Sequence, residues 1–118
     1  MGERLIVEDF PDFQEQARNA TSNTGLTPVV EGTVAGGLAR LEADTFTDVL
    51  TDMGLPDGSG NKIVEAAAGK GIPVIVWTAE PDQLTIHQRI WAERSYDVVV
   101  LDKSRVTEKD LLPRRPIE

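Results

Sequence analysis

The sequence predicts an α/β protein built on a doubly wound, five-stranded parallel sheet with five helices. Segments rich in β-branched residues alternate with segments of helical periodicity along the 118 residues, and this alternation is typical of parallel sheets. Several strand segments are continuously apolar, as expected of parallel strands that helices cover on both faces. A chain of this length forms about one domain. We therefore expect a single domain over residues 1–118, with its core at about residues 4–112.

Five short segments are predicted as strands. Three of them contain unbroken apolar runs, at Leu5–Val7, Val74–Trp77 and Val98–Leu101. The longest of these runs has four residues, which is far too short to span a bilayer. The expected strands cover Arg4–Val7, Pro28–Thr33, Val49–Thr51, Val74–Thr78 and Val98–Leu101.

The segments between the strands have the spacing of amphipathic helices. The first begins after Pro11 and ends before Gly25, and the fourth is expected to turn Ile90 and Trp91 inward. Residues 113–118 are expected to form a frayed tail. The other helices are expected at Val34–Leu41, Ile63–Ala68, Gln83–Arg94 and about Val106–Leu112, where Pro113 ends the last one.

The composition excludes several classes of function. The 12 basic and 20 acidic residues give a net charge of -8, which disfavours binding to phosphate backbones and anionic lipid surfaces. The chain has no cysteine, so it has no disulfide, thiolate zinc site or cysteine nucleophile. It also lacks a signal-peptide pattern. We therefore expect a cytoplasmic protein that contacts neither nucleic acid nor membrane directly.

Polar side chains collect at the carboxyl ends of the expected strands. Glu8 and Asp9 follow the first strand, Asp52 follows the third, Thr78 closes the fourth and Lys103 follows the fifth. Ligands of open parallel sheets bind outside these ends, where the strand order reverses. Three neighbouring carboxylates repel one another, and a hard divalent cation holds them ionised. Mg²⁺ is favoured because it needs few protein ligands and completes its shell with water and phosphate oxygens.

This chemistry makes Asp52 a candidate nucleophile towards a phosphoryl group. A carboxylate can form an acyl phosphate when a metal neutralises the incoming charge. Lys103 and the Thr78 hydroxyl would then face the phosphoryl group on the side away from the metal, as a point charge and a hydrogen-bond donor.

At these residues the chain resembles a bacterial response regulator receiver domain, over about residues 4–112. In that family an acidic pair follows the first strand, as Glu8 and Asp9 do here. The family's phosphoacceptor aspartate is followed by proline four residues later and glycine eight residues later. Asp52, Pro56 and Gly60 match this spacing.

Two further matches are the Thr-Ala pair at the end of the fourth strand, at Thr78-Ala79, and the lysine after the fifth, at Lys103. The resemblance implies a flavodoxin-like sheet of strand order 2-1-3-4-5. It also implies that Asp9, Asp52 and the Gly54 carbonyl bind Mg²⁺, with Glu8 acting largely through water.

The function that the resemblance implies is that of a receiver in two-component, phosphorelay signal transduction. A sensor histidine kinase or phosphotransfer protein would donate a phosphoryl group to Asp52, and the aspartyl phosphate would change binding to a downstream protein or effector domain. Such a phosphoprotein is not an enzyme, apart from self-phosphorylation by small donors and slow autodephosphorylation. Receivers commonly dimerise, so a homodimer stays open.

The chain departs from the family pattern at two positions and in one spacing. Ser104 follows Lys103 where the family usually has proline, and Val100 stands where a switching tyrosine or phenylalanine is common. Between Thr78 and Lys103 lie 24 residues, somewhat more than expected. These departures motivate an alternative, a degenerate receiver that acts only as a protein interaction module.

A third hypothesis is a phosphohydrolase similar to the haloacid dehalogenases, which also uses an aspartate nucleophile, a lysine and Mg²⁺. Its nucleophile normally follows the first strand and has a general-acid aspartate two residues later. Here Asp52 follows the third expected strand and Gly54 stands two residues on, so the general acid is missing. The single histidine, His87, lies in no kinase-like histidine motif and is expected to be an ordinary helix residue.

Overall fold

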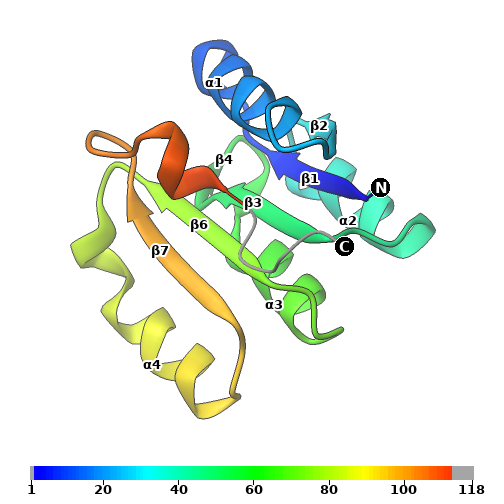
Figure 1. Cartoon of the computed structure of the whole chain (residues 1–118). Helices are drawn as coiled ribbons and strands as arrows, with labels where there is room; N and C mark the ends of the chain where they lie inside the picture. Colours follow the sequence, from blue (N-terminus) through cyan, green and yellow to red (C-terminus); the bar gives the residue numbers. More distant parts are fainter. Residues whose placement is uncertain (1, 113–118) are drawn as a thin grey trace.

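The apolar strands form one parallel sheet in the computed structural model, which describes residues 2–112. The tail predicted for residues 113–118 lies outside the described residues. The strand order is β2-β1-β3-β6-β7, which is the predicted order 2-1-3-4-5 when the five strands are counted along the chain (Figure 1). These strands are β1 (Glu3–Val7), β2 (Thr27–Glu31), β3 (Asp48–Asp52), β6 (Val74–Thr78) and β7 (Val98–Asp102).

Local sequence signals explain where the first helices begin. Pro11 occupies the first turn of the first helix, where its missing N–H group costs no hydrogen bond. The Thr33 hydroxyl accepts a hydrogen bond from the Gly36 N–H at 2.9 Å and so caps the second. The α-helices of the described chain are α1 (Pro11–Ser22), α2 (Val34–Ala43), α3 (Asn61–Ala68) and α4 (Thr85–Glu93).

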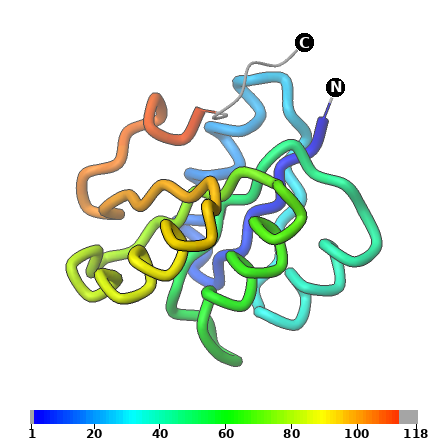
Figure 2. Tube along the Cα trace, turned by 90° about the horizontal axis from the view of Figure 1, so that it is seen from below, coloured from blue at the N-terminus to red at the C-terminus, as the bar shows by residue number. Residues whose placement is uncertain are grey.

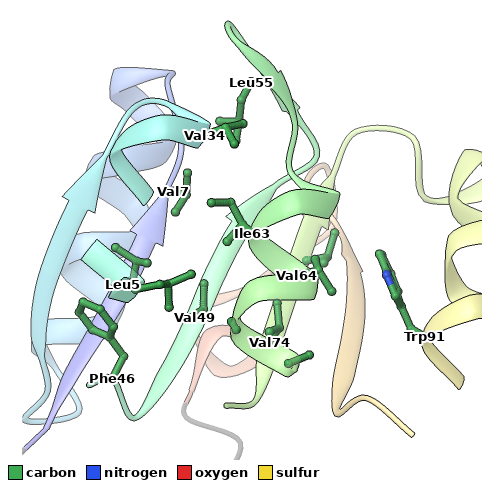
Figure 3. Close-up of a cluster of buried hydrophobic side chains, with 14 of the residues drawn as sticks. Leu5, Val7, Val34, Phe46, Val49, Leu55, Ile63, Val64, Val74 and Trp91 are labelled. Carbon is green, nitrogen blue, oxygen red and sulfur yellow. The ribbon is translucent and has the colours of Figure 1, made fainter. Parts of the chain in front are cut away.

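Apolar side chains pack on both faces of the sheet, as the continuous apolar strands predicted. Helices α2, α3 and α4 lie in a row over one face (Figure 2), where Val49 of the sheet, Ile63 of α3 and Trp91 of α4 belong to one buried apolar cluster (Figure 3). Helix α1 and the C-terminal segment cover the opposite face, where Ala17 and Leu111 are buried. The sheet is therefore the middle layer of three, and its carboxyl ends stay free to carry polar groups.

A buried ion pair joins the neighbouring strands β1 and β3 on the α1 side of the sheet. Arg4 of β1 lies opposite Asp48 of β3 in the strand register. Its guanidinium donates to both Asp48 carboxylate oxygens, at 2.8 and 2.7 Å, and also to the Leu111 carbonyl at 2.5 Å. Arg4 is 0% exposed and Asp48 1%. A single side chain thus ties β1 and β3 to the C-terminal segment.

The prediction of a fifth α-helix is wrong for the described chain. Residues Val106–Leu112 form only a short 3₁₀ turn, η2 (Glu108–Leu111). Thr107 and Asp110 form a capping box at its start, so the turn begins at Glu108 and not at Val106. Pro113 follows shortly after its end in the sequence. Too few residues remain to repay the cost of nucleating an α-helix.

The fourth predicted helix is correct in place but differs in detail. A 3₁₀ turn, η1 (Pro81–Leu84), precedes α4, so the α-helix begins at Thr85. Trp91 is buried as expected, whereas Ile90 is 37% exposed, and the prediction that it turns inward is wrong. None of the helices in residues 2–112 has the length and apolar character that crossing a membrane requires.

Candidate functional site

The carboxyl ends of β1 and β3 bring three predicted acidic residues together. Glu8 and Asp9 follow β1, and Asp52 ends β3. The two strands are paired with Val7 opposite Thr51, so their ends lie side by side. Oxygens of the three carboxylates lie within 4.8 Å of one another. This is the point in the sheet at which the strand order reverses, where open parallel sheets bind ligands.

Lys103 brings a cation to this acidic cluster from the end of β7. Its ammonium nitrogen lies 2.5 Å from Glu8 Oε1 and 3.1 Å from Asp52 Oδ2. The Lys103 side chain is 8% exposed, and that of Asp52 is 13% exposed. Charges that water screens so little interact strongly, and the ammonium therefore balances part of the negative charge of Glu8 and Asp52.

A side-chain turn directs Lys103 into the site without the family's usual proline. The Asp102 carboxylate accepts hydrogen bonds from the Ser104 hydroxyl at 2.7 Å and the Ser104 N–H at 2.9 Å. These two bonds, the hydroxyl first, hold the pKa of Asp102 below its ordinary value. The Lys103 N–H also donates to the Thr78 carbonyl at 2.9 Å. The hydrogen bonds of Ser104 thus hold the backbone after Lys103, at the position where a proline would restrict it.

Two aromatic rings flank the Lys103 ammonium, and sequence reasoning missed their relation to the site. The ammonium lies 4.2 Å from the centre of the Phe13 ring and 5.3 Å from that of Trp77. The two rings meet edge to face at 5.4 Å. Such cation–π contacts attract the ammonium group and help to hold it at this place. The available signal was the position of Phe13, which is in the first turn of the helix that follows Glu8 and Asp9.

Glu8 is the most deeply buried member of the acidic cluster. Its side chain is 0% exposed, and this burial raises the pKa of Glu8 above its ordinary value. The hydrogen bond to Lys103 and the one from the Phe10 N–H at 3.0 Å oppose the rise without cancelling it. The nearby negative charge of Asp52 adds to it. Glu8 therefore depends on nearby positive charge to stay ionised.

Thr78 lies at the same end of the sheet, as predicted, and lines a cavity together with Asp52 and Lys103. The cavity has a volume of about 520 Å³. The Thr78 hydroxyl accepts a hydrogen bond from the Glu80 N–H at 3.2 Å, and a hydroxyl can donate its own proton to a ligand at the same time. The other lining residues are Phe13, Met53, Gly54, Ser59, Ala79, Glu80, Gln83, Leu84 and His87.

The donor set of the acidic cluster fits a hard divalent cation. Glu8, Asp9 and Asp52 offer only carboxylate oxygens, the ligands that Mg²⁺ prefers. Asp9 is exposed while Glu8 is buried, so the cluster opens towards solvent on one side, and a magnesium ion could keep several of its waters. The predicted ligand Gly54 lies close by, since its N–H donates to Asp52 Oδ1 at 3.3 Å. The role of its carbonyl stays a prediction.

The glycine eight residues after Asp52 has a steric reason. A Cβ atom on Gly60 would lie 1.9 Å from the Asp52 carbonyl oxygen, a distance at which backbone must move. The Gly60 N–H donates to the Met53 carbonyl at 2.8 Å, which closes the loop beside Asp52. Only a residue without a side chain allows this approach.

We expect Gly60→Ala to lower the free energy of unfolding by about 1–3 kcal/mol, as overpacking does. Gly54→Ala is the matched control in the same loop, because a Cβ atom on Gly54 meets nothing within 4 Å. We expect it to change stability by less than about 0.5 kcal/mol. Urea unfolding followed by circular dichroism measures both. Equal effects of the two substitutions would contradict the steric argument.

Several solved structures with the same architecture are described as receiver domains. A CheY-like response regulator receiver domain protein from Methanospirillum hungatei has a TM-score of 0.81 and 24% identity, covering 95% of this chain and 88% of that one. The non-phosphorylated HemR receiver domain from Leptospira biflexa has a TM-score of 0.77 and 19% identity, covering 100% of both chains. This chain has the receiver-domain fold. Protein-family models gave no match, and neither did the curated proteins.

A third similar structure is described with a metal ion. The receiver domain of a sensor histidine kinase from Pseudomonas aeruginosa is described with a magnesium ion coordinated in its active-site cleft. It has a TM-score of 0.74 and 19% identity to this chain, covering 93% of this chain and 90% of that one. The acidic cluster of the present receiver fold lies at the carboxyl ends of its strands.

The structure also places Val100, which departs from the family pattern, and His87. Val100 of β7 packs against the core on the side of α2, α3 and α4. His87 of α4 is half-buried and stacks on Trp91, with ring centres 5.7 Å apart. Its interpretation as an ordinary helix residue stays a prediction.

Proposed function

We propose that this chain is a receiver of two-component signalling that accepts a phosphoryl group on Asp52. The observation that carries the proposal is the meeting of Asp52, two further carboxylates and the Lys103 ammonium at one end of a receiver fold, although they come from three different strand ends. The donor would be a sensor histidine kinase or phosphotransfer protein. The product would be a signalling state rather than the turnover of a classical enzyme.

The Asp52 carboxylate is the nucleophile of the proposed step. One of its oxygens attacks the phosphorus atom of a phosphohistidine or an acyl phosphate, so an oxygen–phosphorus bond forms. The bond from phosphorus to the donor atom breaks, and the donor group leaves with that electron pair. The Lys103 ammonium and the Thr78 hydroxyl supply positive charge and a hydrogen bond to the transferred oxygens. The open cavity gives the donor access to Asp52.

Glu8, Asp9, Asp52 and the Gly54 carbonyl are the groups that would hold Mg²⁺. When bound, the ion neutralises the negative charge that the phosphoryl group brings to three carboxylates. The fit of the donor set and the magnesium described in the Pseudomonas receiver support this assignment.

The proposed output is a change of binding partner. An aspartyl phosphate adds negative charge and strong acceptor oxygens next to Lys103, so the ion pair between Lys103 and Asp52 must rearrange. A local charge change of this kind biases two conformations of a switch protein. The downstream partner would be a protein or an effector domain, and the phosphorylated protein would work in the cytoplasm.

Intact mass spectrometry after incubation with Mg²⁺ and acetyl phosphate tests the proposal. We expect a single phosphoryl adduct on the wild type and none on Asp52→Asn, because the amide is a poor nucleophile. Asp12→Asn is the matched control, because it removes an exposed carboxylate of α1 that lies outside the acidic cluster, and it should be labelled like the wild type. Chelation of Mg²⁺ before the donor is added should prevent the adduct.

Other outcomes point to the remaining hypotheses. Full labelling of Asp52→Asn would show that Asp52 is not the acceptor. Absence of both the adduct and Mg²⁺ binding in the wild type would favour the degenerate interaction module. Steady turnover of small phosphoesters would favour the phosphohydrolase.

A further inference from the structure

The loop that follows Asp52 is attached to a helix far away in the sequence. The Asp57 carboxylate accepts a hydrogen bond from the Val34 N–H at 2.7 Å and another from the Ala35 N–H at 3.0 Å. These are free N–H groups of the first turn of α2, and they need acceptors. Asp57 thus caps a helix to which it is not joined in sequence, and these two bonds also lower its pKa.

Apolar packing supports the same attachment. Leu55 of the loop is 9% exposed and lies beside Val34 at the start of α2 (Figure 3). The loop itself is a small antiparallel hairpin of β4 (Gly54–Leu55) and β5 (Gly58–Ser59), each strand two residues long. A hairpin of this size is not stable alone. Its conformation therefore depends on what holds its tip, and Asp57 is at that tip.

From this geometry we propose that Asp57 is a positioning residue of the phosphoacceptor site, which holds the loop carrying Gly54 in the conformation that binds Mg²⁺. The inference rests on the proposed function and adds a residue to it. Mg²⁺ demands near-ideal octahedral geometry, so a backbone ligand must be placed accurately. The two hydrogen bonds fix the loop to α2, which the core holds in turn through buried Val34 and Leu41.

The same connection has a reciprocal consequence. If attachment of Asp57 favours Mg²⁺ binding, then Mg²⁺ binding favours attachment by the same factor, because the two equilibria are linked. The Val34 and Ala35 amides should therefore exchange with solvent more slowly when Mg²⁺ is present. These amides lie on α2, so loading the site would also stabilise the start of that helix.

Magnesium titrations of the full chain, followed by NMR, test the inference. The Gly54 amide shift reports Mg²⁺ binding, and hydrogen exchange at Val34 and Ala35 reports the attachment. We expect Asp57→Ala to raise the magnesium Kd about five- to tenfold, the size typical of a lost helix cap. Asp57→Asn keeps one carbonyl oxygen as an acceptor, so its Kd should lie between those of the wild type and the alanine variant.

The control is Asp44→Asn, which removes an exposed carboxylate from the opposite end of α2 and should leave the Kd unchanged. A wild-type Kd in Asp57→Ala, together with fast exchange at Val34 and Ala35, would show that the attachment has no role in the site. Equal Kd values in the alanine and asparagine variants would show that only charge matters, which also overturns the inference. Failure of the wild type to bind Mg²⁺ would instead refute the proposed magnesium site, and this inference with it.

Discussion

Replacing Arg4 by methionine is expected to lower the free energy of unfolding by about 3–5 kcal/mol, the usual cost of breaking a buried ion pair from one side. The substitution leaves the Asp48 carboxylate buried without its two guanidinium hydrogen bonds. It also removes the donor to the Leu111 carbonyl, which anchors the C-terminal segment. Urea unfolding measures the loss, and hydrogen exchange should show earlier opening of η2.

Two further variants test whether the loss of stability comes from the buried ion pair and not from the loss of any arginine. Arg40→Met breaks the ion pair with Glu31, in which the two side chains are 48% and 25% exposed, and should cost less than about 1 kcal/mol. The double variant Arg4→Met with Asp48→Val removes both buried charges, and we expect it to recover most of the lost stability. A double variant as unstable as Arg4→Met alone would contradict the electrostatic explanation.

The second large effect is expected for Lys103→Met, which should lower the stability of the metal-free protein and raise its affinity for Mg²⁺. Without Mg²⁺ the variant should lose about 3 kcal/mol at neutral pH, because Glu8 and Asp52 lose their nearest positive charge. Its affinity for Mg²⁺ should rise several-fold, because an ammonium group beside the carboxylates repels a cation. Thermal unfolding with and without Mg²⁺ measures both effects, and Lys70→Met is a control at a lysine that bonds the Leu41 carbonyl.

The pH dependence of Lys103→Met follows from Glu8. Burial already raises the pKa of Glu8, and the lysine opposes that rise, so its removal raises the pKa further. The folded state then binds a proton more tightly than the unfolded chain, whose Glu8 titrates near 4.5. The variant should regain stability as the pH falls through the raised folded pKa. A metal-free variant as stable as the wild type, or one with weaker Mg²⁺ binding, would contradict this account.

Continuous apolar runs, together with the alternation of strand and helix segments, predicted the parallel sheet. Val74–Trp77 lies in β6, the fourth strand of the sheet, and is buried throughout, as a strand covered on both faces must be. The prediction of a fifth α-helix was wrong for a local reason, because the 3₁₀ turn that follows the Thr107 cap has only four residues. The fourth helix lies where it was predicted, but its Ile90 side chain is exposed. The periodicity of a short segment does not determine which face of the helix packs against the rest of the chain.

The sequence by itself determined the chain order of the five sheet strands and the four α-helices, and the polar residues at the strand ends, because both follow from residue type and local spacing. Only the tertiary structure decided which groups interact at those ends. Three contacts join segments that are distant in sequence. The Phe13 ring contacts Lys103, the Asp57 carboxylate caps α2, and the Arg4 guanidinium binds Asp48 and the Leu111 carbonyl. Contacts of this kind arise when layers pack against one another, and no local pattern in the chain encodes which side chains then face each other.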